Sequence, residues 1–352
     1  MKIQSFATAA GILSTLVVAI YSLSAAEPKK ADPYMGDWKG KVVLENGSEN
    51  PAALRVISLG RNRYQARVFS TFMKRVEPDV ELTGTIKGDT LEMTDVPLTA
   101  SSIVNFVDGG FVVAGSFVSG KVVDGVLKGT IKGKMNGTFE LKRRAVTSAT
   151  LGKKPPDGAT ILFDGTNLDH WTKRVKPDQE AAPAGWRIVD GTMEVNSTGD
   201  IVTKEAFGDH SLHVEFRTPY MPHASGQGRG NSGVYLQARY ELQVLDSYGL
   251  DGADNECGGI YKIAKPELNM CLPPNEWQTY DIDFRAPRFE GEKKTENARI
   301  TVKHNGIIIH ENLELPNITG GAHVTDESKP GGLLLQDHGN PVRFRNIWVQ
   351  KK

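Results

Sequence analysis

The sequence predicts an all-β protein with two antiparallel domains, the second of which is a two-sheet jelly-roll sandwich. The 352 residues include 37 glycines and 18 prolines, which favour turns, and few runs have the 3.6-residue period of a helix. Short runs of alternating apolar and polar residues recur along the chain, as expected for half-buried strands. A chain of this length suits two domains better than one.

The first 26 residues have the pattern of a secretory signal peptide. Lys2 supplies a positive charge, an apolar stretch runs from Ala7 to Leu23, and small residues at 24–26 offer a cleavage site. An uncleaved membrane anchor is the alternative. No later stretch is long and apolar enough to span a bilayer. We therefore expect an exported protein, periplasmic or extracellular, with no membrane span after signal cleavage.

Residues 33–145 are predicted to form a small accessory β-domain. About eight strand-like runs at regular spacing favour a closed or nearly closed antiparallel barrel or a sandwich. The segment Gly36-Asp-Trp38 resembles the start of lipocalin-type barrels, although this short motif has little specificity. No pair of carboxylates and no histidine cluster in this region suggests catalysis, so we expect a supporting role.

A linker and a larger domain follow. Residues 146–158 contain small residues, two lysines and a Pro-Pro pair, a composition typical of linkers. Residues 159–352 contain ten or more strand-like runs, which indicate two packed antiparallel sheets. The clearest runs are 186–189, 192–195, 211–217, 233–238, 240–245, 278–285, 298–304, 307–311, 332–336 and 342–349.

Charge and motif content exclude several function classes. The 42 basic residues balance the 42 acidic ones, which argues against nucleic acid or an anionic membrane as the main partner. No Gly-rich phosphate loop, zinc motif or nucleophile elbow is present, so no nucleotide cofactor is expected. The two cysteines, Cys257 and Cys271, could form one disulfide or remain free thiols, and the sequence leaves both open.

The most informative segment, from Arg229 to Gly249, is a pair of strands with one polar face. Tyr235, Gln237 and Arg239 alternate with apolar residues in the first strand, and Glu241 and Gln243 do so in the second. Such a face is either a solvated surface or the floor of a polar cleft. Asp246 has the opposite parity, so it joins this face only if the strand bulges or ends before it.

Seven segments in order resemble the motifs of the 3-keto-disaccharide hydrolase domain family, formerly called domain of unknown function 1080. The resemblance covers residues 159–350 and consists of LFDGTNLDHW, DGTMEV, GDHSLHVEFR, GNSGVYLQARYELQVLDSYG, WQTYDIDF, ITVKHNGIIIHEN and LLLQDHGNPVRFRNIWV. It implies a concanavalin A-like sandwich.

The resemblance also implies a specific chemistry. A sugar 3-oxidoreductase first makes the C3 ketone, a base removes the C2 proton, the C1 oxygen leaves by β-elimination, and water adds back. This reaction needs a base near C2 and an electrophile at the ketone oxygen. The family implies a divalent metal such as Ca²⁺ or Mn²⁺ in the latter role.

Glu241 is the first candidate for a catalytic carboxylate. Gln243 lies two residues along on the same face, about 7 Å away at strand rise. Enzymes of the wider fold that cut glucans place a second acid at this position. Because an amide occupies it here, a two-carboxylate retaining mechanism, which needs the carboxyl groups about 5 Å apart, is disfavoured.

A second group of candidates lies near the C-terminus. Gln336 and His338 share one face, and Arg343 and Arg345 share a face in the next strand. His338 is a candidate base, acid or metal ligand together with Glu241, or else a turn histidine bound to backbone. Arg345 either holds an enolate oxygen or pairs with an acid at the sheet edge. We predict catalytic roles for Glu241, His338 and Arg345.

Other residues are predicted to bind substrate or to shape the site. The substrate-binding candidates are Asn231, Gln243, Asp246, Tyr261 and Gln336. Tyr261 lies in a loop where an aromatic ring suits stacking on a sugar. Gly233 is expected to allow close backbone approach. His304, just before the hairpin signal Asn305-Gly306, is expected at the surface.

Two other functions remain open. A carbohydrate-binding module of the same fold needs aromatics and amides but no ionisable groups, and an ordinary glycoside hydrolase needs two matched carboxylates. The ionisable residues favour an enzyme over a binding module, and Gln243 disfavours the ordinary hydrolase.

Overall fold

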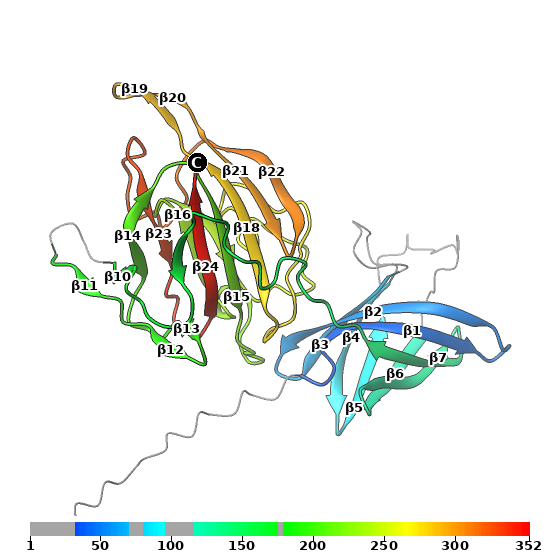
Figure 1. Cartoon of the computed structure of the whole chain (residues 1–352). Coiled ribbons are helices and arrows are strands. Elements are labelled where there is room, and N and C mark those ends of the chain that lie inside the picture. Colours follow the sequence, from blue (N-terminus) through cyan, green and yellow to red (C-terminus); the bar gives the residue numbers. More distant parts are fainter. Residues whose placement is uncertain (1–31, 70–79, 96–115, 175–178) are drawn as a thin grey trace, which may run out of the picture. The chain divides into compact units, whose positions relative to one another are not determined.

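A computed structural model describes residues 32–69, 80–95, 116–174 and 179–352 (Figure 1). The expected signal peptide lies outside the described residues. All the described residues belong to one compact unit. Within the described part of the chain, no helix is long and apolar enough to cross a membrane.

The N-terminal part is a closed barrel in which each of eight strands pairs antiparallel with the next and the last pairs with the first. Its strands are β1 (Gly36–Leu44), β2 (Glu49–Gly60), β3 (Arg63–Phe69), β4 (Val80–Lys87), β5 (Thr90–Asp95), β6 (Ser116–Val123), β7 (Val126–Gly133) and β8 (Gly137–Arg143). A cavity of about 40 Å³ remains inside, and every residue that lines it is apolar.

Trp38 ties the first strand of the barrel to the last. Its side chain is fully buried, and its indole N–H donates to the Tyr34 carbonyl at 2.8 Å. The Arg143 guanidinium, at the end of β8, lies over the Trp38 ring at 4.6 Å from the centroid. Arg143 also donates to the Pro33 carbonyl at 2.7 Å. The Gly-x-Trp motif therefore has a structural role in the barrel.

The C-terminal part is a sandwich of two antiparallel sheets, as predicted. The first sheet has the order β11-β10-β14-β23-β16-β17, and the second has the order β12-β13-β24-β15-β18-β21-β22 with β9 paired to β24. Strands β19 and β20 form a separate hairpin, and a 3-10 turn, η1, spans Gly226–Gly228.

The sandwich strands have these bounds. They are β9 (Thr160–Phe163), β10 (Trp171–Lys173), β11 (Ala182–Pro183), β12 (Arg187–Val189), β13 (Thr192–Glu194), β14 (Ile201–Phe207), β15 (His210–Arg217), β16 (Ser232–Leu236), β17 (Tyr240–Val244), β18 (Gln278–Arg285), β19 (Arg288–Glu290), β20 (Lys293–Glu296), β21 (Ala298–His304), β22 (Ile307–Leu315), β23 (Gly331–Leu335) and β24 (Arg343–Lys351).

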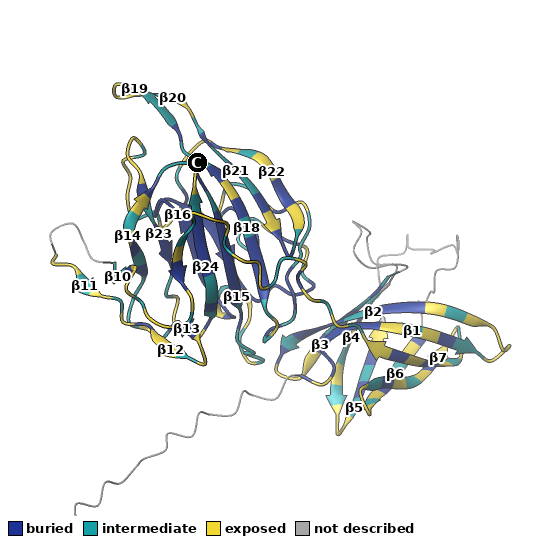
Figure 2. Ribbon diagram, in the orientation of Figure 1, coloured by how far each residue is buried: buried dark blue, intermediate teal, exposed yellow. Residues whose placement is uncertain are grey.

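The core of the sandwich is built from alternate residues of the facing strands. Val234 of β16 and Leu242 of β17 point inward toward the second sheet, as do Val214 and Phe216 of β15 from the other side. Figure 2 shows β15 and β16 largely in the dark blue of buried residues. Because side chains alternate along a strand, the residues between these point to the outer face of their sheet.

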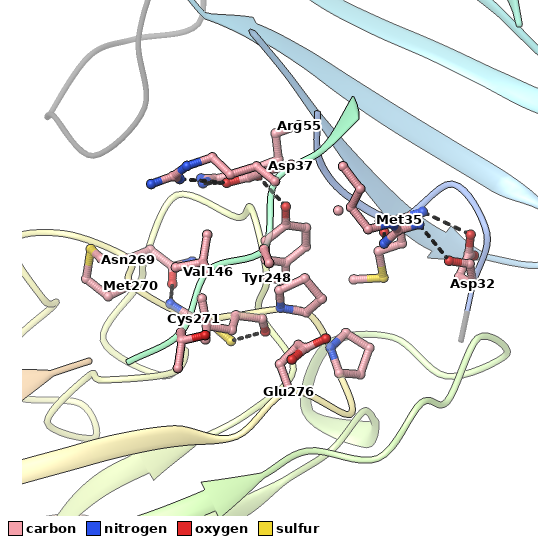
Figure 3. Close-up of a pocket in the computed structure, with 18 of the residues that line it drawn as sticks. Asp32, Met35, Asp37, Arg55, Val146, Tyr248, Asn269, Met270, Cys271 and Glu276 are labelled. Carbon is pink, nitrogen blue, oxygen red and sulfur yellow. Dashed lines mark hydrogen bonds and ion pairs between the residues drawn. The ribbon is translucent and has the colours of Figure 1, made fainter. Parts of the chain in front are cut away.

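Side chains from the barrel and the sandwich are joined by polar contacts. The Tyr220 hydroxyl donates to Asp32 at 3.0 Å, and Arg229 donates to the Ser58 carbonyl at 2.7 Å. Beside these contacts is a cavity of about 220 Å³ (Figure 3), where the Tyr248 hydroxyl points to Asp37. Asp37 in turn pairs with Arg55, so the charges at this cavity neutralise one another.

The two cysteines are both buried and free. Cys257 Sγ lies 3.3 Å from the Tyr280 hydroxyl, in the core of the sandwich. His304 differs from the sequence prediction, since it is fully buried and its Nε2 lies 3.0 Å from the Gln278 side chain. The Asn305-Gly306 turn forms as predicted, but it folds inward against the chain near Ala149.

Trp38→Ala should destabilise the barrel. Removing a large buried aromatic side chain costs about 3–5 kcal/mol, because it leaves a cavity and loses buried contacts. Urea unfolding should show this loss, while Phe117→Ala, which truncates a 39% exposed side chain in the same barrel, should change stability by less than about 0.5 kcal/mol. Equal effects of the two substitutions would contradict the structural role of Trp38.

Candidate functional site

The outer face of the six-stranded sheet carries the polar row that the sequence predicted. Strand register aligns one row of outward side chains across four neighbouring strands, namely Val202, Leu334, Tyr235 and Glu241. The next row consists of Gly233 of β16 and Gln243 of β17, and it continues through Gln336, just after β23, to Asp200, just before β14. Polar groups from β16 and β17 therefore lie beside Asp200, about 40 residues earlier in the chain, and Gln336, more than 90 residues later.

Glu241 is a buried carboxylate with a strongly perturbed affinity for protons. Only 3% of the residue is exposed. Burial raises the pKa of its carboxyl group from 4.5 to about 7, while the Tyr235 hydroxyl opposes this rise by hydrogen bonding and the charge of Asp200 adds to it. At neutral pH both protonation states of Glu241 are populated, which suits a group that accepts and returns a proton.

Tyr235 holds the carboxylate from the neighbouring strand. Its ring is fully buried, and burial together with the charge of Glu241 raises the pKa of its hydroxyl well above the usual value. The hydroxyl therefore keeps its proton and can donate it to Glu241. Gln336 donates from Nε2 to the same hydroxyl oxygen at 3.1 Å. Gln336 thus reaches the site, as predicted, although its contact is with Tyr235.

Gly233 leaves room for the Glu241 carboxylate. A Cβ at this position would lie 2.5 Å from Glu241 Oε1 and 2.9 Å from a ring carbon of Tyr235, both closer than van der Waals contact allows. The sequence predicted that this glycine permits backbone approach. The structure shows instead that it admits two side chains.

Two loops hold the backbone of Glu241. Tyr261 N–H donates to the Glu241 carbonyl at 3.1 Å, and Glu241 N–H donates to Thr319 Oγ1 at 3.0 Å. The half-buried Tyr261 ring lies beside Gly320, where a Cβ would be 3.5 Å away. Tyr261 is therefore close to Glu241, as the sequence predicted for an aromatic at the site.

An unpredicted pair, Asp200 and His323, lies on the same face. His323 Nε2 is 3.2 Å from Asp200 Oδ2, and the imidazole ring lies against Tyr235 with centroids 5.8 Å apart. Burial tends to raise the pKa of Asp200, but hydrogen bonds to His323 and to the Asp337 N–H outweigh this effect and lower it. No spacing in the sequence marks this pair, because 123 positions separate the two residues and both lie outside the strands.

The predicted amides Asn231 and Gln243 bind each other. Gln243 Nε2 donates to Asn231 Oδ1 at 2.8 Å and to the Ser232 carbonyl at 3.1 Å. Asn231 Nδ2 donates to the Gln227 carbonyl at 2.8 Å. Both are buried, so the arrangement fixes the strand pair next to Glu241 and leaves little of either amide for a ligand.

Asp246 lies beyond the end of β17 and apart from the Glu241 face. Its carboxylate pairs with Arg229 Nε at 3.1 Å, and both side chains are buried. Burial raises the pKa of Asp246, and the charge of Arg229 opposes the rise. The structure therefore gives Asp246 an internal partner instead of the predicted place beside substrate.

The polar row also differs from the prediction at the hairpin. Strand β16 ends at Leu236, and Gln237 and Ala238 have φ of 52° and 54°, so they form the turn. Gln237 donates to the Phe207 carbonyl at 2.8 Å and accepts from Arg239 Nη1 at 2.9 Å. Gln237 and Arg239 therefore support the turn and do not extend the row from Tyr235.

Arg345 belongs to the other sheet. It lies on the outer face of β24, where its Nε is 2.7 Å from Glu215 Oε2 and its guanidinium covers the Trp277 ring at 4.1 Å. The outer faces of the two sheets are on opposite sides of the sandwich. Arg345 therefore cannot share a site with Glu241. Of the two roles predicted for Arg345, pairing with an acid is the one that the structure shows.

His338 lies in the loop after β23 and is exposed. The strand ends at Leu335, so the alternation that placed His338 beside Gln336 no longer applies. Across the described ranges, no three His, Cys, Asp or Glu side chains converge as metal ligands do. The side chains around Glu241 therefore do not fit the predicted carboxylate–imidazole metal site.

Gly233→Ala should disturb the site more than it disturbs the fold. The added methyl group must displace the Glu241 carboxylate or the Tyr235 ring, and overpacking of this kind costs about 1–3 kcal/mol. The melting temperature and the activity should both fall. Gly208→Ala is the matched control, because no described atom lies within 4 Å of its would-be Cβ. Full activity in Gly233→Ala would contradict the close packing.

The raised pKa of Glu241 predicts how stability varies with pH. The folded protein keeps a proton that the unfolded chain releases, so this contribution is complete below about pH 4.5 and is lost as the pH rises through about 7. The unfolding free energy of wild type relative to Glu241→Gln should fall by on the order of 3 kcal/mol over that window. Urea titrations at a series of pH values measure it, and a flat difference would contradict the burial.

Comparison with known proteins identifies the sandwich. A protein of Bacteroides thetaiotaomicron named 3-keto-disaccharide hydrolase is 24% identical over 243 residues, covering 55% of this chain and 78% of the relative. A crystal structure of a candidate glycosyl hydrolase from Parabacteroides distasonis is 35% identical, covers 56% of this chain and 85% of that chain, and has a TM-score of 0.50.

A protein family described as the 3-keto-alpha-glucoside-1,2-lyase-like domain matches residues 158–350. The matched region contains both sheets and every residue of the Glu241 site. Because the match covers more than half of the sequence and agrees with the motifs, the chain belongs to this family.

Proposed function

We propose that this chain is an enzyme that cleaves 3-keto glycosides by β-elimination and hydration, with Glu241 as the base. The observation that carries the proposal is a buried carboxylate with a pKa of about 7 on the outer face of the sandwich. Family membership and the names of both relatives support a carbohydrate-cleaving enzyme. The name of the B. thetaiotaomicron relative and the description of the family support the choice of a 3-keto substrate.

The chemistry requires a base matched to a weak carbon acid. A ketone at C3 acidifies the C2 proton, and Glu241 takes that proton to give an enolate. The enolate electron pair then forms the C1–C2 double bond as the C1–oxygen bond breaks. Water adds to C1 and Glu241 returns its proton to C2, which gives the 3-keto sugar and the free alcohol. A carboxylate with a pKa near neutrality transfers protons in both directions most effectively.

The surrounding residues support this role. Tyr235 orients the carboxylate, and Gly233 leaves space for it. The half-buried Tyr261, whose N–H binds the Glu241 carbonyl, would supply an aromatic ring for stacking on a sugar. The substrate must come from an oxidation of the C3 hydroxyl, so the enzyme would act after a sugar 3-oxidoreductase. Export by the N-terminal signal would place that step in the periplasm or outside the cell.

Glu241→Gln should abolish most of the reaction. Loss of a general base costs about 10²–10⁴-fold, so kcat/KM for a 3-keto-glucoside should fall by that factor, and deuterium incorporation at C2 from D₂O should fall with it. For wild type, kcat/KM should increase as the pH rises through about 7, because the base must be deprotonated. Glu205→Gln, on β14 of the same sheet, is the control and should change neither kcat/KM nor deuterium incorporation at C2.

Parallel assays with other substrates separate the alternatives. Equal cleavage of the unoxidised glycoside would indicate an ordinary glycoside hydrolase. Binding of sugar without turnover of either substrate would indicate a carbohydrate-binding module. Cleavage of the 3-keto substrate is also measured after treatment with a chelator and again after Ca²⁺ or Mn²⁺ is added back, which tests for a metal requirement.

A further inference from the structure

The Asp200 carboxylate is held in a fixed orientation on the Glu241 face. Its Oδ1 accepts the Asp337 N–H at 2.8 Å, and the Asp337 carboxylate in turn accepts the Gly199 N–H at 2.9 Å. These backbone contacts fix Asp200 without any help from a histidine. Its other oxygen, Oδ2, is left facing His323 Nε2 at 3.2 Å, with Arg174 farther away at 3.6 Å.

The His323 segment is attached to the hairpin that carries Tyr235 and Glu241. His323 N–H donates to the Ala238 carbonyl at 3.0 Å, and Thr319 N–H donates to the Arg239 carbonyl at 3.0 Å. The imidazole ring then lies against Tyr235, the side chain that hydrogen bonds to Glu241. Two carbonyls of the turn therefore place the ring one side chain away from the base.

His323 is more exposed to solvent than Glu241 and Tyr235. The side chains of His323 and Asp200 are 17% and 14% exposed, whereas Tyr235 is fully buried. Nε2 is directed to Asp200, and among the described residues no side chain or backbone group hydrogen bonds to Nδ1. A carboxylate that binds one ring nitrogen fixes the orientation of the other, as in catalytic triads.

The elimination needs a second proton transfer that Glu241 cannot supply. While Glu241 accepts the C2 proton, the departing C1 oxygen needs a proton unless it leaves as a stable anion. Tyr235 is unsuited because its buried hydroxyl holds its proton firmly. Among the described residues around Glu241, His323 combines a partly exposed imidazole with an orientation fixed by Asp200 and the Tyr235 ring.

We propose that His323, oriented by Asp200, is the general acid that protonates the departing C1 oxygen of the 3-keto glycoside. This inference rests on the proposed function of Glu241. The imidazolium gives its Nδ1 proton to the leaving oxygen and keeps its Nε2 proton on Asp200. In the hydration step, neutral His323 takes a proton from water as the oxygen bonds to C1, while Glu241 returns its proton to C2. Both groups end the cycle in their starting states.

The test separates proton removal from bond cleavage in the full-length mature protein. C2 deuterium exchange from D₂O reports the base alone. Cleavage of a 3-keto-disaccharide requires the acid, whereas cleavage of a 3-keto-glucoside of 4-nitrophenol releases an anion that needs no proton. For His323→Gln we expect C2 exchange within about threefold of wild type, about 10²–10⁴-fold slower disaccharide cleavage, and less than about tenfold loss on the nitrophenyl substrate.

Two further variants complete the design. His323→Asn gives a second test if His323→Gln folds poorly. The melting temperature of each variant shows whether it is folded. His170→Gln, an exposed histidine elsewhere on the sandwich, is the control and should match wild type on both substrates. Asp200→Asn tests the positioning residue. It should slow disaccharide cleavage by about tenfold or more, change the pH profile on that substrate, and spare the nitrophenyl substrate.

The two proposals fail in different ways. Equal losses on both leaving groups, or loss of C2 exchange in His323→Gln, would overturn the acid role of His323 and leave Glu241 as base. Retention of C2 exchange in Glu241→Gln would overturn the proposed function itself.

Discussion

The burial of the Glu241 carboxylate is the constraint on which the rest of the site depends. A charged group in that position loses hydration, so its pKa rises to about 7. The fold tolerates this cost because Tyr235 donates a hydrogen bond and Gly233 removes a side chain that would collide. Backbone contacts from Tyr261 and Thr319 then keep β17 in place, so the carboxylate is both destabilised as an anion and fixed in direction.

The outer face of the second sheet carries a cluster of charges that differs from the Glu241 site because its charges are paired. Glu215 there binds Arg345 at 2.7 Å and the Gly152 N–H at 2.6 Å, and its pKa is lowered to about 2 although burial works to raise it. Asp281 pairs with His213 and with Lys153 of the linker segment. Every acid in this cluster is compensated, which anchors the linker. Among the described residues no cation acts on Glu241, and the absence of a compensating charge leaves its pKa raised, as the proposed role of a base requires.

The barrel contributes at the far end of the strand that carries Glu241. Arg229 pairs with Asp246, two residues beyond β17, and also donates to the Ser58 carbonyl of β2. A guanidinium with several donors can satisfy both partners at once. This support of β17 is the clearest role that the described contacts give the barrel.

The sequence by itself determined the strand alternation, and with it the all-β class, about eight strands in the first domain arranged as either a barrel or a sandwich, the sandwich of the second domain and the face on which Glu241 lies. These features follow from local periodicity, which each segment carries alone. Only the tertiary structure decided which distant residues share that face. In the tertiary structure Asp200 and His323 lie beside Tyr235, whereas Arg345 lies on the opposite side of the sandwich. Strand β16 ends before Gln237 and β23 ends before His338. His304 is buried. The physical reason is that strand register, loop docking and the ends of strands depend on contacts between segments far apart in the chain, which no local pattern encodes.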